Sequence, residues 1–203
     1  MPGVLVIGAS RGLGAELAKK YAAKRENTVL ATSRSEKTED FETVKWIPNI
    51  DVSAKDAGIK LAEGCKSHGP LDIVIITAGY FATETFDEPN WDDEVKMYTI
   101  SAIGPVFLVH HLVKAGALAK GAKIVFVSSE SGSIKLRHES EGGGNYGHHA
   151  SKSALNMVGK LLSLDLKDKG IAVCVVHVSH AFALLRLPVG LIPANSLASC
   201  GQR

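Results

Sequence analysis

Cysteine is scarce in this chain. Its 203 residues include three cysteines, Cys65, Cys174 and Cys200. An odd and scattered set predicts neither a disulfide framework nor a cysteine metal site, so we expect no bound metal. An excess of one charge is also missing, because 23 basic and 21 acidic residues leave a net charge of +2. This near balance predicts neither nucleic acid nor a membrane surface as a partner.

Long apolar runs are absent as well. No run reaches the ~18–20 residues that a membrane-spanning helix needs. The apolar run at residues 4–7 is short and follows no basic segment, so it predicts a first strand and not a signal peptide. These absences predict a cytoplasmic protein, and 203 residues suit one domain with a sizeable core.

The sequence alternates apolar blocks with segments of helical periodicity. The blocks are mostly continuous, which is typical of strands covered on both faces. The expected strands are residues 4–7, 28–33, 44–50, 71–77, 123–127 and 171–177, and the expected helices are residues 13–24, 54–68, 87–117 and 150–167. The polar residues 34–42 predict a loop as the second crossover. This order predicts an α/β fold, a single Rossmann-type domain with a doubly wound parallel sheet.

The C-terminal end differs in composition from the rest. No Asp or Glu follows Asp168 in the last 35 residues, and residues 181–203 show no clear period. We therefore expect a nucleotide-binding domain at residues 1–177 and a truncated or atypical tail at residues 178–203. A shift of reading frame near residue 178 would explain such a tail.

A glycine-rich turn directly follows the first expected strand. Gly8, Gly12 and Gly14 have the pattern G-x-x-x-G-x-G and precede the first helical segment. A helix N-terminus offers free N–H groups and the positive end of its dipole to an anion such as a phosphate. Gly8 permits a tight turn, Gly12 lets a ligand approach the backbone, and Gly14 lets the helix pack close to the strand. The turn therefore predicts a nucleotide site.

Further motifs follow the later strands. Asp51-Val52 comes after the third expected strand and Ala78-Gly79 after the fourth, the serine pair ending at Ser129 follows the fifth, and Lys152 opens the last helix. With the glycine turn, these motifs make the chain resemble the short-chain dehydrogenase/reductase family over residues 3–177, above all its C-factor-like, carbonyl-reductase-type branch. The cofactor-binding residues that this resemblance implies are Gly8, Ser10, Arg11, Gly12, Leu13, Gly14, Arg34, Asp51, Val52, Ala78, Gly79 and Lys152.

The end of the second strand favours NADP(H) over NAD(H). Enzymes that prefer NAD usually place Asp or Glu there to bind the ribose hydroxyls. Here residues 31–34 hold no carboxylate, and small Thr32 and Ser33 leave room for a phosphate. Arg11 and Arg34 could together bind the 2′-phosphate of NADP(H). The alternative is that both arginines are solvated surface charges.

The resemblance also implies four catalytic positions. Ser129 matches the serine that binds the carbonyl oxygen, and Lys152 matches the lysine that holds the nicotinamide ribose. The family's tyrosine lies four residues before that lysine, where this chain has His148, and Tyr146 lies six residues before it. Ser101 takes the place of the family's asparagine. Two of the four positions therefore differ from the family pattern.

Three interpretations of the proton donor stay open. His148 could serve as the general acid, because imidazole titrates near neutral pH and histidine is the commonest proton-transfer side chain. Alternatively, the glycine-rich turn before the helix could let Tyr146 swing into the site. In the third interpretation no donor is in place, and the protein only binds nucleotide.

These observations predict an NADP(H)-dependent oxidoreductase of the carbonyl reductase or alcohol dehydrogenase type. It would transfer hydride between nicotinamide and a small carbonyl or hydroxyl compound. The alternative is a catalytically silent nucleotide-binding or regulatory homologue. By analogy with the family, we expect a homodimer through the long helices 87–117 and 150–167.

Overall fold

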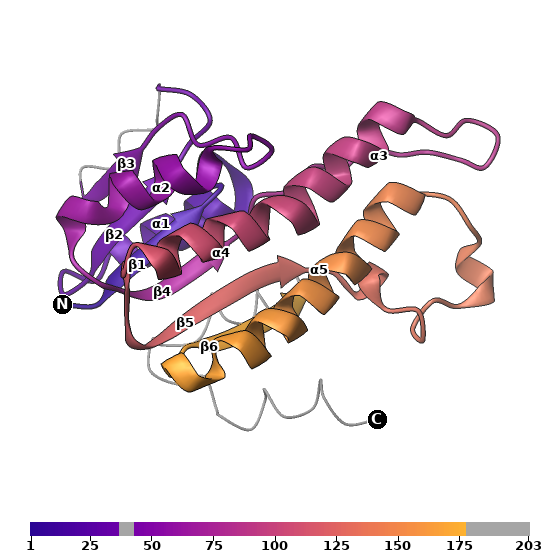
Figure 1. Ribbon diagram of the computed structural model, residues 1–203. Helices are drawn as coiled ribbons and strands as arrows, with labels where there is room; N and C mark the ends of the chain where they lie inside the picture. Colours follow the sequence, from indigo (N-terminus) through magenta and orange to yellow (C-terminus); the bar gives the residue numbers. More distant parts are fainter. Residues whose placement is uncertain (37–42, 178–203) are drawn as a thin grey trace.

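The computed structural model describes residues 1–36 and 43–177 (Figure 1). In this part of the chain, six strands form one sheet in the order β3-β2-β1-β4-β5-β6, and every neighbouring pair is parallel. The strands are β1 (Gly3–Ile7), β2 (Thr28–Thr32), β3 (Val44–Ile47), β4 (Leu71–Ile76), β5 (Leu118–Ser128) and β6 (Ala172–His177). This order is that of the dinucleotide-binding doubly wound sheet, so the predicted Rossmann-type fold is confirmed.

Helices cover both faces of this sheet. The α-helices are α1 (Gly12–Ala22), α2 (Ala57–Cys65), α3 (Trp91–Tyr98), α4 (Gly104–Lys114) and α5 (Tyr146–Asp165). A π-helical turn, η2 (Thr99–Ile103), joins α3 to α4, and the short 3-10 turns are η1 (Lys66–His68), η3 (Glu130–Gly132), η4 (Glu139–Glu141) and η5 (Lys167–Lys169). In Figure 1, α2, α4 and α5 lie together on one face of the sheet.

The core has two parts because successive residues of a strand point to opposite faces. On β1, Leu5 and Ile7 pack with residues of α2, α4 and α5, whereas Val4 and Val6 pack with residues of α1. All four side chains are fully buried. The sheet is therefore covered on both sides at its centre, as the continuous apolar blocks predict.

Several predicted boundaries are wrong. The predicted helix 87–117 begins at Trp91, where the Asn90 side chain accepts a hydrogen bond from the Asp93 amide (3.1 Å) and caps α3. The predicted strand 44–50 ends at Ile47, shortly before Asn49 adopts a positive φ of 60°. The predicted helix 150–167 begins at Tyr146, because a carboxylate from another loop bonds its first turn. The predicted tail 178–203 lies outside the described residues.

Candidate nucleotide and active site

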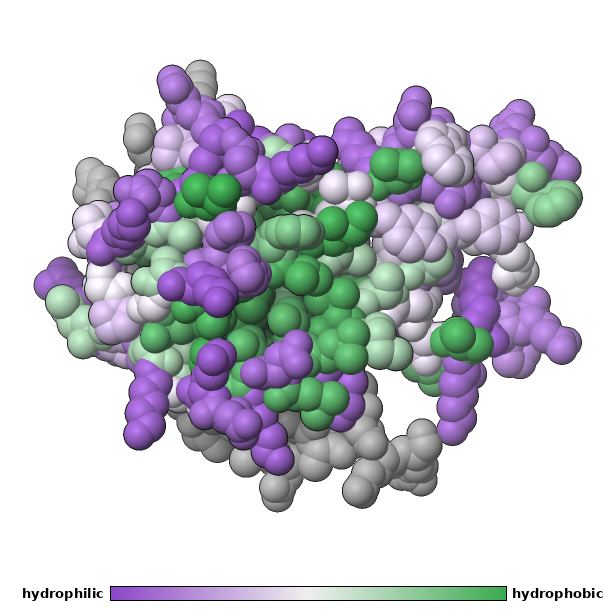
Figure 2. Space-filling view, in the orientation of Figure 1, coloured by the Kyte–Doolittle hydropathy of each residue, from purple (hydrophilic) through white to green (hydrophobic). Residues whose placement is uncertain are grey.

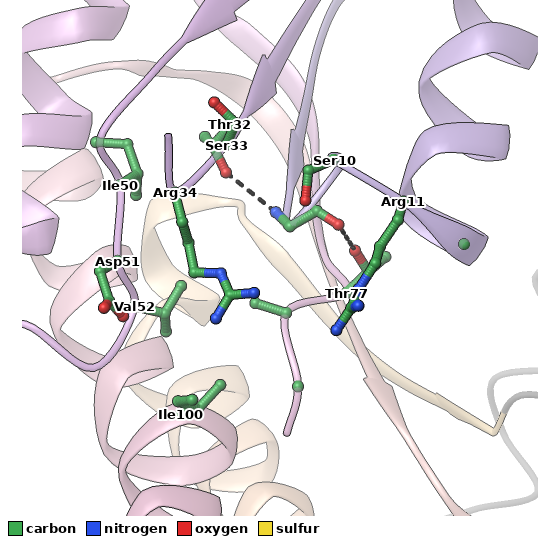
Figure 3. Close-up of a pocket in the computed structure, with 14 residues that line it drawn as sticks. Ser10, Arg11, Thr32, Ser33, Arg34, Ile50, Asp51, Val52, Thr77 and Ile100 are labelled. Atoms are coloured by element: carbon green, nitrogen blue, oxygen red, sulfur yellow. Dashed lines mark hydrogen bonds between the residues drawn. The ribbon is translucent and has the colours of Figure 1, made fainter. Parts of the chain in front are cut away.

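A pocket opens at the carboxyl ends of β1, β2 and β4 (Figure 3). In an open α/β sheet this is the switch point, where the chain continues to one side of the first strand and then to the other. The pocket is lined by Gly8, Ser10, Arg11, Gly12, Thr32, Ser33, Arg34, Ile50, Asp51, Val52, Thr77, Ala78, Gly79 and Ile100. Nine predicted cofactor residues thus surround one cavity.

The glycine turn is held from both neighbouring strands. The Gly8 amide donates to Thr32 Oγ1 (3.0 Å), and Thr77 Oγ1 donates to the backbone oxygen of Ile7 (2.9 Å). Thr77 Oγ1 also lies 3.1 Å from the Gly8 oxygen. Figure 3 draws hydrogen bonds of the glycine turn to Thr32 and Thr77 as dashed lines. Gly8 has a φ of +88°, and a Cβ there would stand 2.7 Å from the Ala78 amide nitrogen. Only glycine fits this turn without strain.

The N-terminus of α1 faces the pocket with its amides available. Arg11 is the N-cap residue, but its side chain makes no capping bond, and the first turn of α1 holds no acidic residue. The first amides of the helix therefore keep their capacity for an anion. In Figure 3 the side chains of Arg11 and Arg34 enter the pocket from different sides. Backbone amides and two guanidinium groups thus share one cavity, a donor set suited to phosphate groups.

Asp51 provides the pocket's carboxylate. Its Oδ1 accepts hydrogen bonds from the Ser53 hydroxyl (2.7 Å) and the Ser53 amide (2.9 Å). The bond from the Ser53 hydroxyl is the main reason that the pKa of Asp51 lies below its usual value, and the charge of Arg34 adds to the effect. An ionised Asp51 is an acceptor for hydroxyl or amino groups of a ligand.

Three predicted cofactor residues lie outside this pocket lining. Leu13 packs against the core on the α1 side. Gly14 backs the glycine turn, since a Cβ there would overlap the Gly8 oxygen and approach Thr77 Oγ1 to 2.6 Å. Lys152 belongs to a second group of side chains, on α5. The sequence analysis in turn missed three lining residues, Thr77, Ile50 and Ile100.

The second group gathers where β5 ends beside α5. Ser129 follows β5, and its Oγ accepts a hydrogen bond from the Ser131 amide (3.2 Å). Lys152 extends from α5 and donates through Nζ to the oxygen of Val127 (3.0 Å). Burial lowers the pKa of Lys152 below its usual value. One bond to Val127 leaves the ammonium group two further donors for a ligand.

His148 stands one helical turn before Lys152 on α5. Positions four apart share a helix face, and the charge of Lys152 acts on the imidazole. Burial is the main cause that lowers the pKa of His148, and the charges of Lys152 and His149 lower it further. The ring of Phe81 meets the His148 ring edge-on, with 4.9 Å between the centroids. His148 is therefore a half-buried imidazole that favours its neutral form.

Tyr146 occupies different surroundings. It is the first residue of α5, and its side chain is 40% exposed. It lines a separate cavity with Thr83, Phe86 and Gly143, between the loop that precedes α3 and the loop that precedes α5. The predicted glycine-rich turn does precede it, but Tyr146 itself belongs to the helix.

Ser101, another predicted catalytic residue, is buried next to α5. It lies in the π-helical turn η2, which packs against α5, and it is 1% exposed. Its hydroxyl finds no hydrogen-bond partner among the described residues. A buried hydroxyl without a partner is costly, so this position calls for a water molecule or a ligand group.

Comparison with known proteins agrees with this geometry. Residues 3–180 match the family described as short chain dehydrogenase. The chain belongs to the short-chain dehydrogenase family. It is 26% identical over 178 residues to 1-hydroxy-2-glutathionyl-2-methyl-3-butene dehydrogenase of Rhodococcus sp. (strain AD45), covering 87% of this chain and 76% of that protein. It is also 28% identical over 129 residues to C-signal of Myxococcus xanthus, covering 62% of this chain and 75% of that protein.

Solved structures share the fold of this short-chain dehydrogenase. NADPH-bound carbonyl reductase from chicken fatty liver superposes with a TM-score of 0.74 at 23% identity, covering 87% of this chain and 75% of that one. At this identity the likeness is one of fold. Family membership makes the chain an oxidoreductase of the short-chain type.

Within residues 1–36 and 43–177 of this short-chain dehydrogenase, no helix is long and apolar enough to cross a membrane. The same residues hold no group of three or more His, Cys, Asp and Glu side chains placed to bind a metal ion.

Proposed function

We propose that this protein is an NADP(H)-dependent carbonyl reductase or alcohol dehydrogenase that acts on a small carbonyl or hydroxyl compound. Residues 1–177 would form the nucleotide-binding domain. The observation that carries the proposal is that the pocket and a group of catalytic candidates lie next to each other at one edge of the sheet. The phosphate-type pocket lies at the ends of β1, β2 and β4, and Ser129, His148 and Lys152 lie beside the end of β5, the next strand.

The pocket's residues fit a dinucleotide with a 2′-phosphate. Arg11 and Arg34 would bind that phosphate, Asp51 would accept a bond from the adenine side, and the turn at Gly8 and Gly12 would receive the pyrophosphate. When bound, the nicotinamide would supply or accept the hydride. Lys152 would use its two remaining donors on the nicotinamide ribose.

Ser129 and His148 would handle the substrate oxygen. The Ser129 hydroxyl would donate to the carbonyl oxygen and hold it in place. His148 would give its proton to that oxygen during reduction and take a proton back during alcohol oxidation. Burial and then the positive charge of Lys152 lower the pKa of His148, so its imidazolium is a stronger acid, which assists donation.

Steady-state oxidation of NADPH with a panel of carbonyl compounds tests this proposal. We expect His148→Ala to lower kcat by about 100-fold or more, the usual contribution of a general acid. Tyr146→Phe should stay near wild type, because Tyr146 lines the outer cavity. Tight NADPH binding without turnover in every variant would instead support the second candidate, a silent nucleotide-binding or regulatory homologue. The observation that favours this candidate is the histidine at the family's tyrosine position.

Binding of the two dinucleotides tests the cofactor assignment. A guanidinium that bonds a phosphate contributes about 1.5–3 kcal/mol, so Arg34→Ala should weaken NADPH binding by about 10-fold or more. NADH lacks the 2′-phosphate, and its affinity should change little. Equal losses for both dinucleotides, or none for either, would contradict an NADP-specific role of Arg34.

We also propose that two copies of the chain associate through α4 and α5. Figure 2 shows an apolar area in the middle of this face. The exposed large apolar side chains of η2, α4 and α5 are Ile103, Phe107, Met157, Leu161 and Leu164. Contiguous exposed apolar surface is typical of an interaction site. Sedimentation equilibrium should find a dimer, and Phe107→Glu should convert it to a monomer. The control is Ile134→Glu, which changes an exposed apolar residue outside α4 and α5 and should leave the dimer intact.

A further inference from the structure

Glu84 is a buried carboxylate outside the pocket and the catalytic group. It lies in the segment between β4 and α3 and is 7% exposed. Its Oε1 accepts a hydrogen bond from the Gly147 amide (2.6 Å), and its Oε2 accepts one from the Asn90 amide (3.4 Å). Burying a carboxylate is costly unless hydrogen bonds compensate. Its partner Gly147 belongs to α5, 63 residues further along the chain.

The backbone of Glu84 binds the same place. The Asn145 amide donates to the Glu84 oxygen (2.9 Å), and the Glu84 amide donates to Asn145 Oδ1 (3.2 Å). With the bond from Gly147, three hydrogen bonds therefore join Glu84 to the start of α5. In Figure 1 the loop before α3 and the loop before α5 extend from the same end of the molecule.

The helix α5 lacks a cap of its own. Its N-cap residue Asn145 has left-handed dihedral angles (φ 50°, ψ 41°), and its side chain makes no capping bond. The first turn holds no acidic residue. The first amides of a helix need acceptors, and a negative charge there also favours the helix dipole. Glu84 supplies both an acceptor and a carboxylate from a distant loop, because its Oε1 accepts a hydrogen bond from the amide of the second helical residue, Gly147.

Glu94 of α3 faces the Glu84 carboxylate. Burial, followed by the negative charge of Glu84 and a hydrogen bond with it, raises the pKa of Glu94 above its usual value.

This arrangement constrains His148 from two directions. His148 directly follows Gly147, whose lack of a side chain lets α5 approach α3, since a Cβ there would stand 3.2 Å from Glu94 Cα. The ring of His148 in turn packs on Phe81, three residues before Glu84. The same loop therefore fixes both the backbone and the ring of His148.

We propose that Glu84 is a positioning residue for His148: it caps α5 from another loop and holds the first turn that carries the imidazole. The inference rests on the proposed function, in which His148 moves the proton. It assigns Glu84 no contact with substrate or cofactor. Removing its carboxylate should therefore lower kcat and leave the dinucleotide affinity unchanged.

The test compares wild type with Glu84→Ala and Glu84→Asp. Aspartate keeps the charge but is one methylene shorter, so its oxygens withdraw from Gly147. Glu88→Asp makes the same change at an exposed glutamate of the same loop and serves as control. We expect both Glu84 variants to shift the NMR signal of the His148 ring and to speed hydrogen exchange at the Gly147 amide by about fivefold, the size of a lost cap. The kcat should fall by about 10- to 100-fold, as for a misplaced catalytic group.

Two readouts separate the possible failures. If the His148 signal and Gly147 exchange match wild type in Glu84→Asp, the inference is overturned, whatever happens to activity. If Glu84→Ala does not fold, Glu84→Asp alone decides by the same signals. If these signals move but wild type shows no turnover with any carbonyl compound, the positioning of His148 stands and the proposed function fails. A loss of NADPH affinity equal to the loss in kcat would also overturn the inference, because it would indicate general damage.

Discussion

We expect the rate of carbonyl reduction to fall steeply between about pH 7 and about pH 8, because His148 must carry a proton to act as the acid. Burial, and then the charges of Lys152 and His149, lower its pKa from the ordinary value of 6.5. Because this pKa lies below 6.5, the imidazolium is already the minor form at about pH 7, and its fraction falls nearly tenfold by about pH 8. The kcat/KM for reduction should therefore drop by about eight- to tenfold over that interval.

The assay is kcat/KM for NADPH oxidation, because kcat/KM reports the ionisation of the free enzyme, the form in which burial and the charges of Lys152 and His149 lower the pKa of His148. Alcohol oxidation serves as the internal comparison. It needs neutral His148, so its rate should rise to a plateau above the His148 pKa and stay level where reduction falls. Tyr146→Phe should reproduce both profiles, since Tyr146 lines the outer cavity.

Replacing the acid should move the profile. In His148→Tyr the donor is a phenol with an ordinary pKa of about 10, so the fall in reduction should shift to alkaline pH. A wild-type reduction rate that stays level from about pH 6.5 to about pH 8.5 would refute the assignment of His148 as the acid.

Three further predictions concern stability, each measured by urea unfolding. Gly14→Ala should cost about 1–3 kcal/mol, because the new Cβ would overlap the Gly8 oxygen, whereas Gly79→Ala, with its nearest atom at 3.9 Å, should change stability by less than about 1 kcal/mol. Equal effects would show that the turn yields to the added methyl group. Phe126→Ala, at a fully buried site, should cost about 3–5 kcal/mol, and a loss below about 1 kcal/mol would contradict its place in the core. Asn90→Ala should cost about 1 kcal/mol through the lost cap of α3, and an unchanged midpoint would contradict that cap.

The fold could be predicted because its signals are local. The apolar block at β1, the glycines after it and the alternation of strands with helices each lie within short stretches of sequence. Most of the nucleotide pocket follows from the same stretches, since parallel strands bring the residues after their carboxyl ends to one edge. Thr77 was missed because its role is a hydrogen bond to β1, 70 residues away, which no local pattern signals.

The start of α5 shows the opposite case. Periodicity predicts that this helix begins at residue 150, because Gly147 and the glycines before it weaken any local helix signal. The structure begins the helix at Tyr146, with Glu84 as the external acceptor. The error matters for function, since it decides whether His148 lies in a turn or on the same helix face as Lys152.

The nucleotide pocket and the catalytic group around His148 therefore respond differently to substitution. The nucleotide pocket is lined by residues that follow several different strands, so it does not depend on the start of one helix. The catalytic group depends on the start of α5, which is capped by Glu84, 63 residues before Gly147 in the chain. A change at Glu84 would leave the pocket's lining intact while it displaces His148. Nucleotide binding should thus survive substitutions that abolish turnover, so affinity for NADPH alone is no measure of whether this protein catalyses.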